Sequence, residues 1–290
     1  MSGPLRSSPV LVLLTVVAGL LLPAVPAAAA PSFQRYVAIG DSFTSGPFIP
    51  PQVSPGCFRS GRNYPSLVSE RLGVPLADVS CAGAGIREMF ARQTGGPFGA
   101  IANQPPQLDA LTPQTDLVTL GLGGNEMGYI ELALRCARHG VTNLTGSPCR
   151  DDVLRDGHDE YQAAIEQAEA GVDRVLGEIR KRAPQARILV VNYMQVMPED
   201  TGCHPDVPFA AGDVTYLHGL QRTLNEMLAR QAGENRVEHV DVYAASAGRH
   251  ACAPADQRWV EDAFPENEGA PLHPNAAGMA GVADLILRQL

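Results

Sequence analysis

The sequence predicts a single α/β domain built on a parallel β-sheet. Apolar segments typical of strands alternate along the chain with amphipathic helical segments, which is the pattern of α/β proteins. The strand segments are apolar almost throughout, as expected for a parallel sheet that helices cover on both faces. The composition agrees, because 45% of the 290 residues are hydrophobic and 18% are charged, as in ordinary globular proteins.

Five apolar segments are the expected strands, and four periodic segments are the expected helices. The strands cover residues 35–40, 77–83, 116–124, 187–194 and 237–243. The helices cover residues 64–72, 154–182, 214–232 and 276–290. The clearest helix is the second, in which Ile165, Val172 and Ile179 fall on one face at helical spacing. No internal repeat or linker marks a second domain.

Residues 1–30 have the layout of a secretory signal peptide. Arg6 precedes an apolar run over residues 10–22, and small residues follow at 24–30, where a signal peptidase would cut. The apolar run is too short for a comfortable membrane span. We therefore expect residues 1–30 to be removed and residues 31–290 to form a secreted protein without stable membrane insertion. An uncleaved N-terminal anchor is the alternative.

The balance of charge argues against a nucleic-acid partner. The formal net charge is −9 at pH 7, and loss of Arg6 with the leader makes the mature chain more acidic. Binding to a phosphate backbone needs a basic face, which this sequence does not supply. We expect no nucleic acid among the partners of this chain.

Six cysteines lie in the exported part of the chain, at positions 57, 81, 136, 149, 203 and 252. An even number in an oxidising compartment favours disulfides. Neighbours in sequence give the shortest closures: Cys57–Cys81, Cys136–Cys149 and Cys203–Cys252. The alternative for the last pair is a zinc site in which His204 and His250 join the two cysteines.

Reactive residue types follow the first three expected strands. The segments are GDS at 40–42, SCAGAG at 80–85 and GGNE at 123–126. Ligands of parallel α/β sheets bind outside the carboxyl ends of the strands. A serine nucleophile there needs a base and hydrogen-bond donors aimed at the oxyanion. The backbone N–H of Ser42, the unobstructed Gly83 and the side-chain amide of Asn125 are the candidate donors.

A candidate base lies just before the last expected helix, in the segment GAPLHPNAAG. Pro274 favours an extended conformation for His273. Asn275 is a good N-cap for the helix that follows. The imidazole of His273 is thereby presented from a loop that is fixed to the fold.

Four segments in this order resemble the four conserved blocks of the SGNH, or GDSL, hydrolases. They are GDSF at 40–43, SCAGA at 80–84, GGNE at 123–126 and HPNAAG at 273–278. The cysteine pairs resemble the secreted bacterial lipase and esterase branch. The resemblance implies Ser42 as nucleophile, His273 as general base and acid, and Ser42, Gly83 and Asn125 as the oxyanion hole. It also implies a three-layer flavodoxin-like sandwich with strand order 2-1-3-4-5, and no cofactor or metal.

Two positions depart from the family pattern. Many members have an aspartate three residues before the histidine, and Ala270 stands there. In the branch that this chain resembles, a backbone carbonyl orients the imidazole, so we expect the Ala270 carbonyl to do so. Glu266, Glu268 and Asp262 are the alternative orienting groups. Glu126 replaces the usual aspartate beside Asn125, and the family role there is structural support for Asn125.

The resemblance implies a secreted serine esterase or lipase that acts on a small-molecule ester or lipid, and we expect a monomer. A carbohydrate-ester deacetylase or acyltransferase with the same two residues is an alternative, and a non-catalytic secreted binding module is another. Long Pro- and Gly-rich loops carry apolar residues that would line an acyl groove or merely cover the sheet. These residues are Pro47, Phe48, Ile49, Pro50, Pro51, Met89, Phe90, Pro97, Phe98 and Ile101.

Overall fold

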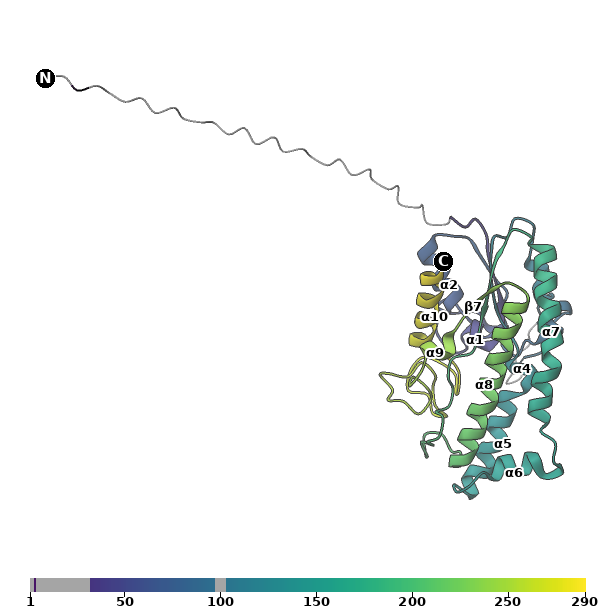
Figure 1. Ribbon diagram of the computed structural model, residues 1–290, viewed down its shortest axis with the longest axis vertical. Coiled ribbons are helices and arrows are strands. Elements are labelled where there is room, and N and C mark those ends of the chain that lie inside the picture. Colours follow the sequence, from purple (N-terminus) through teal and green to yellow (C-terminus); the bar gives the residue numbers. More distant parts are fainter. Residues whose placement is uncertain (1–2, 4–31, 97–102) are drawn as a thin grey trace. The chain divides into compact units, whose positions relative to one another are not determined.

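A five-stranded parallel sheet is the centre of the domain (Figure 1). Its strands are β1 (Tyr36–Gly40), β4 (Leu76–Asp78), β5 (Leu117–Gly121), β6 (Arg187–Val191) and β7 (Glu238–Val240). The strands pair in the order β4-β1-β5-β6-β7, and every pairing is parallel. By position along the chain this is the order 2-1-3-4-5. The expected flavodoxin-like sheet is therefore confirmed.

The computed structural model describes residue 3, residues 32–96 and residues 103–290. The unit from Ser32 to Leu290 is treated below by itself. The expected signal peptide, residues 1–30, lies outside the described residues except for Gly3, and its removal stays a prediction.

Helices pack on both faces of the sheet (Figure 1). The long helices are α2 (Tyr64–Leu72), α7 (Glu160–Arg182), α8 (Ala211–Glu234) and α10 (Ala276–Gln289). Helices α2 and α10 pack together on one side, and α7 packs on α8 on the other. All four expected helices are present. The expected start of the second at residue 154 is wrong, because a 3-10 turn ends at Gly157 and Asp159 caps α7.

Strand β1 lies between β4 and β5, and all its residues are buried. Its last residue, Gly40, pairs with Gly121 at the end of β5. A Cβ atom on Gly40 would lie 2.8 Å from the carbonyl oxygen of Gly121, which is closer than real side chains approach. Glycine at this position therefore lets β1 and β5 pair up to their ends, and Asp41 and Ser42 follow directly at the sheet edge.

Several elements were not anticipated from the sequence. The larger ones are α5 (Tyr129–Thr142) and α6 (Pro148–Val153), with an antiparallel pair of β2 (Gln52–Ser54) and β3 (Arg59–Ser60). Short helices are α1 (Ser42–Ser45), α3 (Ile86–Phe90), α4 (Gly124–Met127) and α9 (Val242–Ala245). Turns of 3-10 type cover Pro55–Cys57, Gln107–Ala110 and Leu154–Asp156. Helices α1, α3 and α4 all lie beside the carboxyl edge of the sheet and shape the site.

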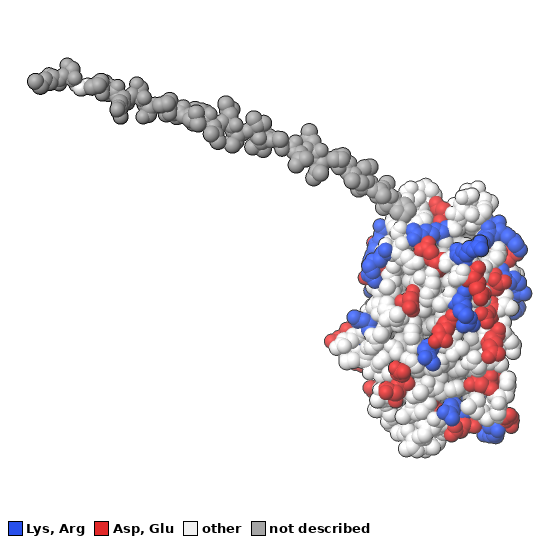
Figure 2. Space-filling view, viewed as in Figure 1, with Lys and Arg blue, Asp and Glu red and all other residues white. Residues whose placement is uncertain are grey.

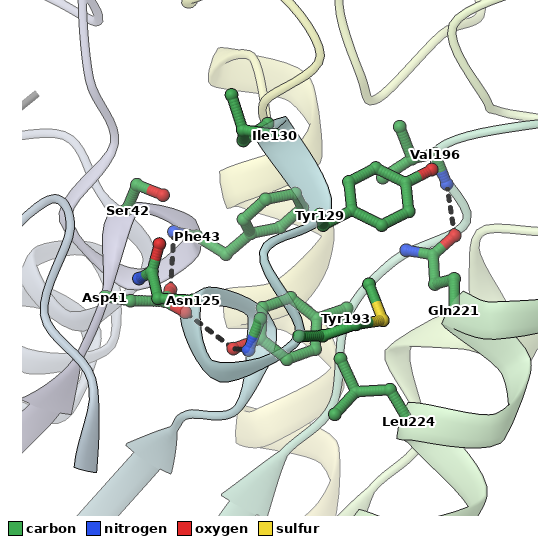
Figure 3. A pocket seen from close by; sticks show the side chains of 12 residues that line it. Asp41, Ser42, Phe43, Asn125, Tyr129, Ile130, Tyr193, Val196, Gln221 and Leu224 are labelled. Carbon is green, nitrogen blue, oxygen red and sulfur yellow. Dashed lines mark hydrogen bonds between the residues drawn. The ribbon is translucent and has the colours of Figure 1, made fainter. Parts of the chain in front are cut away.

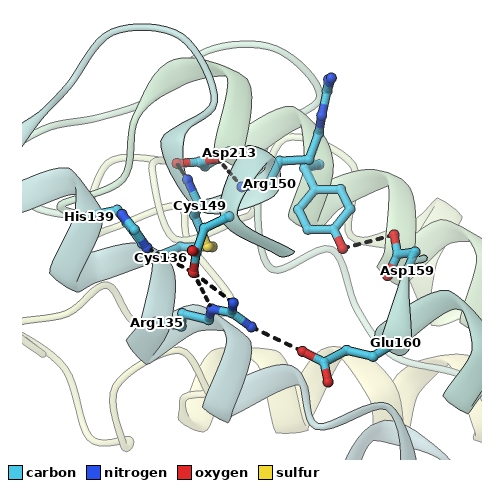
Figure 4. The surroundings of a disulfide bond; sticks show 10 residues. Arg135, Cys136, His139, Cys149, Arg150, Asp159, Glu160 and Asp213 are labelled. Atoms are coloured by element: carbon cyan, nitrogen blue, oxygen red, sulfur yellow. Dashed lines mark hydrogen bonds and ion pairs between the residues drawn. A yellow bond between two sulfur atoms is a disulfide. The ribbon is translucent and has the colours of Figure 1, made fainter. Parts of the chain in front are cut away.

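All three expected disulfides are present: Cys57–Cys81, Cys136–Cys149 and Cys203–Cys252. The sulfurs of Cys203 and Cys252 are bonded to each other, which replaces the zinc alternative. Figure 4 shows the bond that joins α5 to α6. Asp213 of α8 supports this corner, because its carboxylate accepts the backbone N–H groups of Cys149 and Arg150 at the start of α6.

Acidic and basic side chains are interspersed on the face drawn in Figure 2. Many of them are paired; Arg135, for example, donates to Asp152 and also to Glu160, and Figure 4 shows the second of these pairs. Such exposed or half-exposed pairs each contribute about 0 to 1 kcal/mol. In the described part of the chain, no helix is both long and apolar enough to span a bilayer.

Replacing a disulfide by two serines should destabilise the fold by an amount that rises with the logarithm of the length of the closed loop. The closures span 49 positions for Cys203–Cys252 and 13 for Cys136–Cys149. The chain-entropy relation gives losses of about 4 and about 3 kcal/mol, respectively. Urea unfolding of the two double-serine variants measures both losses. Equal or reversed losses would contradict the entropic account.

Candidate active site

Ser42 is the first residue of α1, directly after the turn that ends β1. Asp41 caps this helix, because its Oδ1 accepts the N–H of Phe43 at 2.8 Å. Gly46 ends α1 after one turn in the left-handed conformation, with φ +73°. The hydroxyl of Ser42 is thus placed at the carboxyl edge of the sheet, where its residue is 9% exposed.

The imidazole of His273 contacts this serine. Its Nε2 lies 2.9 Å from Ser42 Oγ, although the two residues are 231 positions apart. Its Nδ1 lies 2.7 Å from the carbonyl oxygen of Pro271, which can only accept, so Nδ1 carries the proton. Nε2 is then the acceptor for the serine hydroxyl. Burial lowers the pKa of His273 below its usual value, which favours this neutral form.

The prediction that the Ala270 carbonyl orients the imidazole is wrong by one residue, because the Pro271 carbonyl does so. The Ala270 oxygen accepts the backbone N–H of His273 at 3.1 Å and so closes a tight turn. Pro271 and Leu272 are the central residues of this turn, and Leu272 has φ +56°, as a type II turn requires. The turn occupies the Ala270 carbonyl and leaves that of Pro271 to face the imidazole.

The alternative carboxylates are held elsewhere. Asp262 and Glu266 both pair with Arg258, and Glu268 pairs with Arg62 at 2.7 Å. None of the three therefore hydrogen-bonds to His273. The histidine at this site is oriented by a neutral backbone acceptor.

Gly83 and Asn125 lie with Ser42 and His273 around one hollow of about 210 Å³. Gly83 has φ +78°, a conformation that glycine adopts freely and that fixes the direction of its peptide group. Asn125 donates one amide hydrogen to the carbonyl of Ala84 at 2.8 Å, which orients the side chain. An amide has two hydrogens, so one remains for a ligand. The structure thus brings together the four residues named from the sequence.

Glu126 does not support Asn125 directly. Its Oε1 accepts the N–H of Ile86 at the start of α3, so the carboxylate ties the turn after β5 to the turn after β4. Burial raises the pKa of Glu126 above its usual value, and the Ile86 hydrogen bond opposes that rise. The side chain is a brace between two turns that carry Asn125 and Gly83.

A hydrogen-bond network that the sequence did not reveal links the turn after β1 to the turn after β5. The hydroxyl of Tyr193 donates to Asp41 Oδ2 at 2.5 Å and accepts the N–H of Gly124 at 2.8 Å. Figure 3 shows Tyr193 beside Asp41, and both residues line a narrow cavity that Ser42 also borders. Tyr193 comes two residues after β6. Its position just beyond the carboxyl end of a strand was the one sequence signal that it lies near the site.

Only some of the residues expected in an acyl groove line the hollow beside Ser42. Pro47 and Phe48 line the hollow beside Ser42, together with Phe58 and Ile130. Ile49 and Met89 are fully buried in the core. Pro50 and Pro51 are exposed, and Phe90 stacks under Arg174, away from the hollow. Pro97, Phe98 and Ile101 lie outside the described residues. Across the described ranges, no three His, Cys, Asp or Glu side chains converge to hold a metal ion.

Comparisons with known proteins identify the family and the fold of the chain. A family model described as "GDSL-like Lipase/Acylhydrolase family" matches residues 38–280. "Lipase 2" of Streptomyces coelicolor is 37% identical over 272 residues, which cover 90% of this chain and 87% of that protein. "Esterase" of Streptomyces scabiei is 31% identical, with 83% of this chain and 81% of that protein covered. The solved structure of an extracellular lipase from Streptomyces rimosus has a TM-score of 0.71 at 24% identity, covering 89% of this chain and all of that one.

Fold and similarity together place the protein among the carboxylic ester hydrolases. More narrowly, the chain belongs to the GDSL-like lipase/acylhydrolase family.

The pH dependence of stability should report the buried Asp41. Burial raises the pKa of Asp41 from 3.8 to about 7, and the bonds from Tyr193 and Phe43 oppose the rise. An acid with a raised folded-state pKa adds stability that is complete below its unfolded pKa and is lost as pH rises through the folded pKa. Asp41→Asn removes this dependence. Its unfolding free energy relative to wild type should therefore increase between pH 4 and 7, by up to about 4 kcal/mol.

Urea unfolding at a series of pH values measures that difference. A difference that stays flat between pH 4 and 7 would show that Asp41 titrates near its ordinary value.

Proposed function

We propose that the protein is an exported esterase or lipase that hydrolyses acyl esters through a covalent intermediate on Ser42. The observation that carries the proposal is the 2.9 Å contact between His273 Nε2 and Ser42 Oγ. A serine hydroxyl is a weak nucleophile until a base accepts its proton. The Pro271 carbonyl supports this assignment because it fixes the tautomer in which Nε2 is the base.

The reaction has two steps. Ser42 Oγ attacks the ester carbonyl while His273 Nε2 takes the hydroxyl proton, and the resulting imidazolium protonates the departing alkoxide. A water molecule then attacks the acyl-enzyme, His273 takes its proton, and the same proton returns to Ser42 as the carboxylic acid leaves. A carbonyl oxygen supports the imidazolium less than a carboxylate would, so the oxyanion donors carry more of the stabilisation.

The donors proposed for the oxyanion are the backbone N–H groups of Ser42 and Gly83 and the second amide hydrogen of Asn125. Within the described residues, neither backbone N–H donates to a protein acceptor. Donors without a competing partner are ready for the charge that develops on the carbonyl oxygen. All three residues border the same hollow.

Lipid or simple apolar esters are the substrate class that the hollow fits. Its walls include Phe48, Phe58 and Ile130. Pockets that bind apolar ligands combine such walls with a few polar groups that fix orientation. The names of the two relatives, lipase and esterase, agree with this class.

Two features of the chain support the proposal that it is exported. Residues 1–30 have the signal-peptide pattern, and the three disulfides require an oxidising compartment to form and persist. The mature enzyme would then begin near residue 31 and act outside the cell.

Hydrolysis of nitrophenyl esters from acetyl to palmitoyl tests the reaction and the substrate class. The oxidised, leaderless protein should turn over medium or long chains best, and Ser42→Ala should abolish turnover. Activity confined to the acetyl ester would indicate a deacetylase instead. Full activity in folded Ser42→Ala would refute the mechanism.

Asn125→Ala should lower kcat by roughly 100- to 1000-fold, the usual effect of removing one oxyanion donor. Steady-state kinetics on the best nitrophenyl ester measures it. Asn235→Ala is the matched control, because Asn235 donates to Asp173 of α7 and to Gln231 at the end of α8, neither of which lines the hollow, so kcat should be unchanged. An unchanged kcat in Asn125→Ala would remove this amide from the oxyanion hole.

A further inference from the structure

Tyr193 connects the ends of three strands. It follows β6, its hydroxyl donates to Asp41 after β1, and it accepts from Gly124 after β5. Each partner is the neighbour of a residue in the proposed mechanism: Asp41 precedes Ser42, and Gly124 precedes Asn125. We propose that Tyr193 is a positioning residue, whose hydroxyl fixes the distance between the nucleophile and the oxyanion donor. This inference rests on the proposed function of Ser42 and Asn125.

Tyr193 and its two partners, Asp41 and Gly124, are called the clamp below, and its hydrogen bonds have one consistent direction. The N–H of Gly124 can only donate, so the Tyr193 oxygen accepts it and the Tyr193 hydrogen is directed to Asp41. Asp41 uses its other oxygen for the N–H of Phe43, at the start of α1. Movement of the Asn125 turn is thereby transmitted to the helix that carries Ser42.

Tyr193 is itself rigid. Its backbone N–H donates to Asn225 Oδ1, and its carbonyl accepts from Asn225 Nδ2, at 2.9 Å each. These two bonds tie it to the middle of α8. Its ring also packs edge-on against Phe43, with ring centroids 5.1 Å apart (Figure 3). A hydroxyl on so fixed a ring can hold its two partners at set positions.

Tyr193 and Asp41 are almost completely buried, at 4% and 1% exposed, and both line the narrow cavity beside Ser42. Burial and the nearby Asp41 charge raise the pKa of Tyr193 well above its usual value, so the hydroxyl stays protonated and keeps donating. Removing the hydroxyl leaves a buried carboxyl group and a buried N–H without this partner, and the two turns then relax independently.

The experiment compares Tyr193→Phe with a control that removes the same type of bond elsewhere. Tyr216 donates to Asp159 Oδ2 at 2.9 Å, and Asp159 caps α7 as Asp41 caps α1. Tyr216→Phe therefore deletes a tyrosine-to-capping-aspartate bond far along the chain from the turns of the site. Both variants, wild type and Ser42→Ala are assayed on the same nitrophenyl ester, and thermal unfolding is recorded for each.

Tyr193→Phe should lower kcat by about ten- to a hundredfold with KM nearly unchanged, because small misplacements of reacting groups have effects of this size. Tyr216→Phe should keep wild-type kcat and KM. A wild-type kcat in Tyr193→Phe, with Ser42→Ala inactive, would overturn the clamp and leave the proposed function intact. Activity in both Ser42→Ala and Tyr193→Phe would instead refute the proposed function itself.

A double-mutant cycle separates the clamp from a general loss of packing. Asp41→Asn keeps an oxygen for the N–H of Phe43 but turns an amide donor towards Tyr193, which cannot accept the tyrosine hydrogen. If Tyr193 acts through Asp41, the kcat of the Tyr193→Phe, Asp41→Asn double variant should equal that of the single variant with the lower kcat. Losses that multiply would show that the two side chains act separately and would overturn the proposal.

Discussion

The location of β1 between β4 and β5 is the constraint on which the site depends. Parallel pairing brings the carboxyl ends of these three strands to one edge, and each strand then continues into a turn that carries one part of the site. A Cβ atom on Gly40 would collide with the Gly121 carbonyl and with Thr44 of α1, so glycine is needed where β1 ends and the chain continues to Ser42. Ser42, Gly83 and Asn125 converge because the sheet is built in this order.

Much of this arrangement was predictable because short segments of the sequence determine it. The strands are apolar runs, and the turns that follow them carry Ser42, Gly83 and Asn125 in recognisable segments. Helix α5 was missed because Cys136 and Gly140 occupy inward positions where larger apolar residues would make the periodicity visible. Gly140 is required by close packing against the Pro208 backbone, a contact that no local pattern reveals.

The orientation of His273 was predicted in kind but not in detail. A backbone carbonyl does accept from Nδ1, yet it belongs to Pro271 because Leu272 takes a positive φ that its residue type does not suggest. The bond between Tyr193 and Asp41 was beyond prediction for a different reason. It joins residues 152 positions apart, and each of them looks locally like an ordinary turn or strand-end residue.

The two residues of the proposed dyad come from opposite ends of the chain, 231 positions apart. His273 is positioned by the turn before α10, and α10 is held by packing on α2, whose residues are made much earlier. A chain that ends before α10 would have the serine but not its base. The proposed dyad is therefore complete only when the turn before α10 is packed against the carboxyl edge of the sheet.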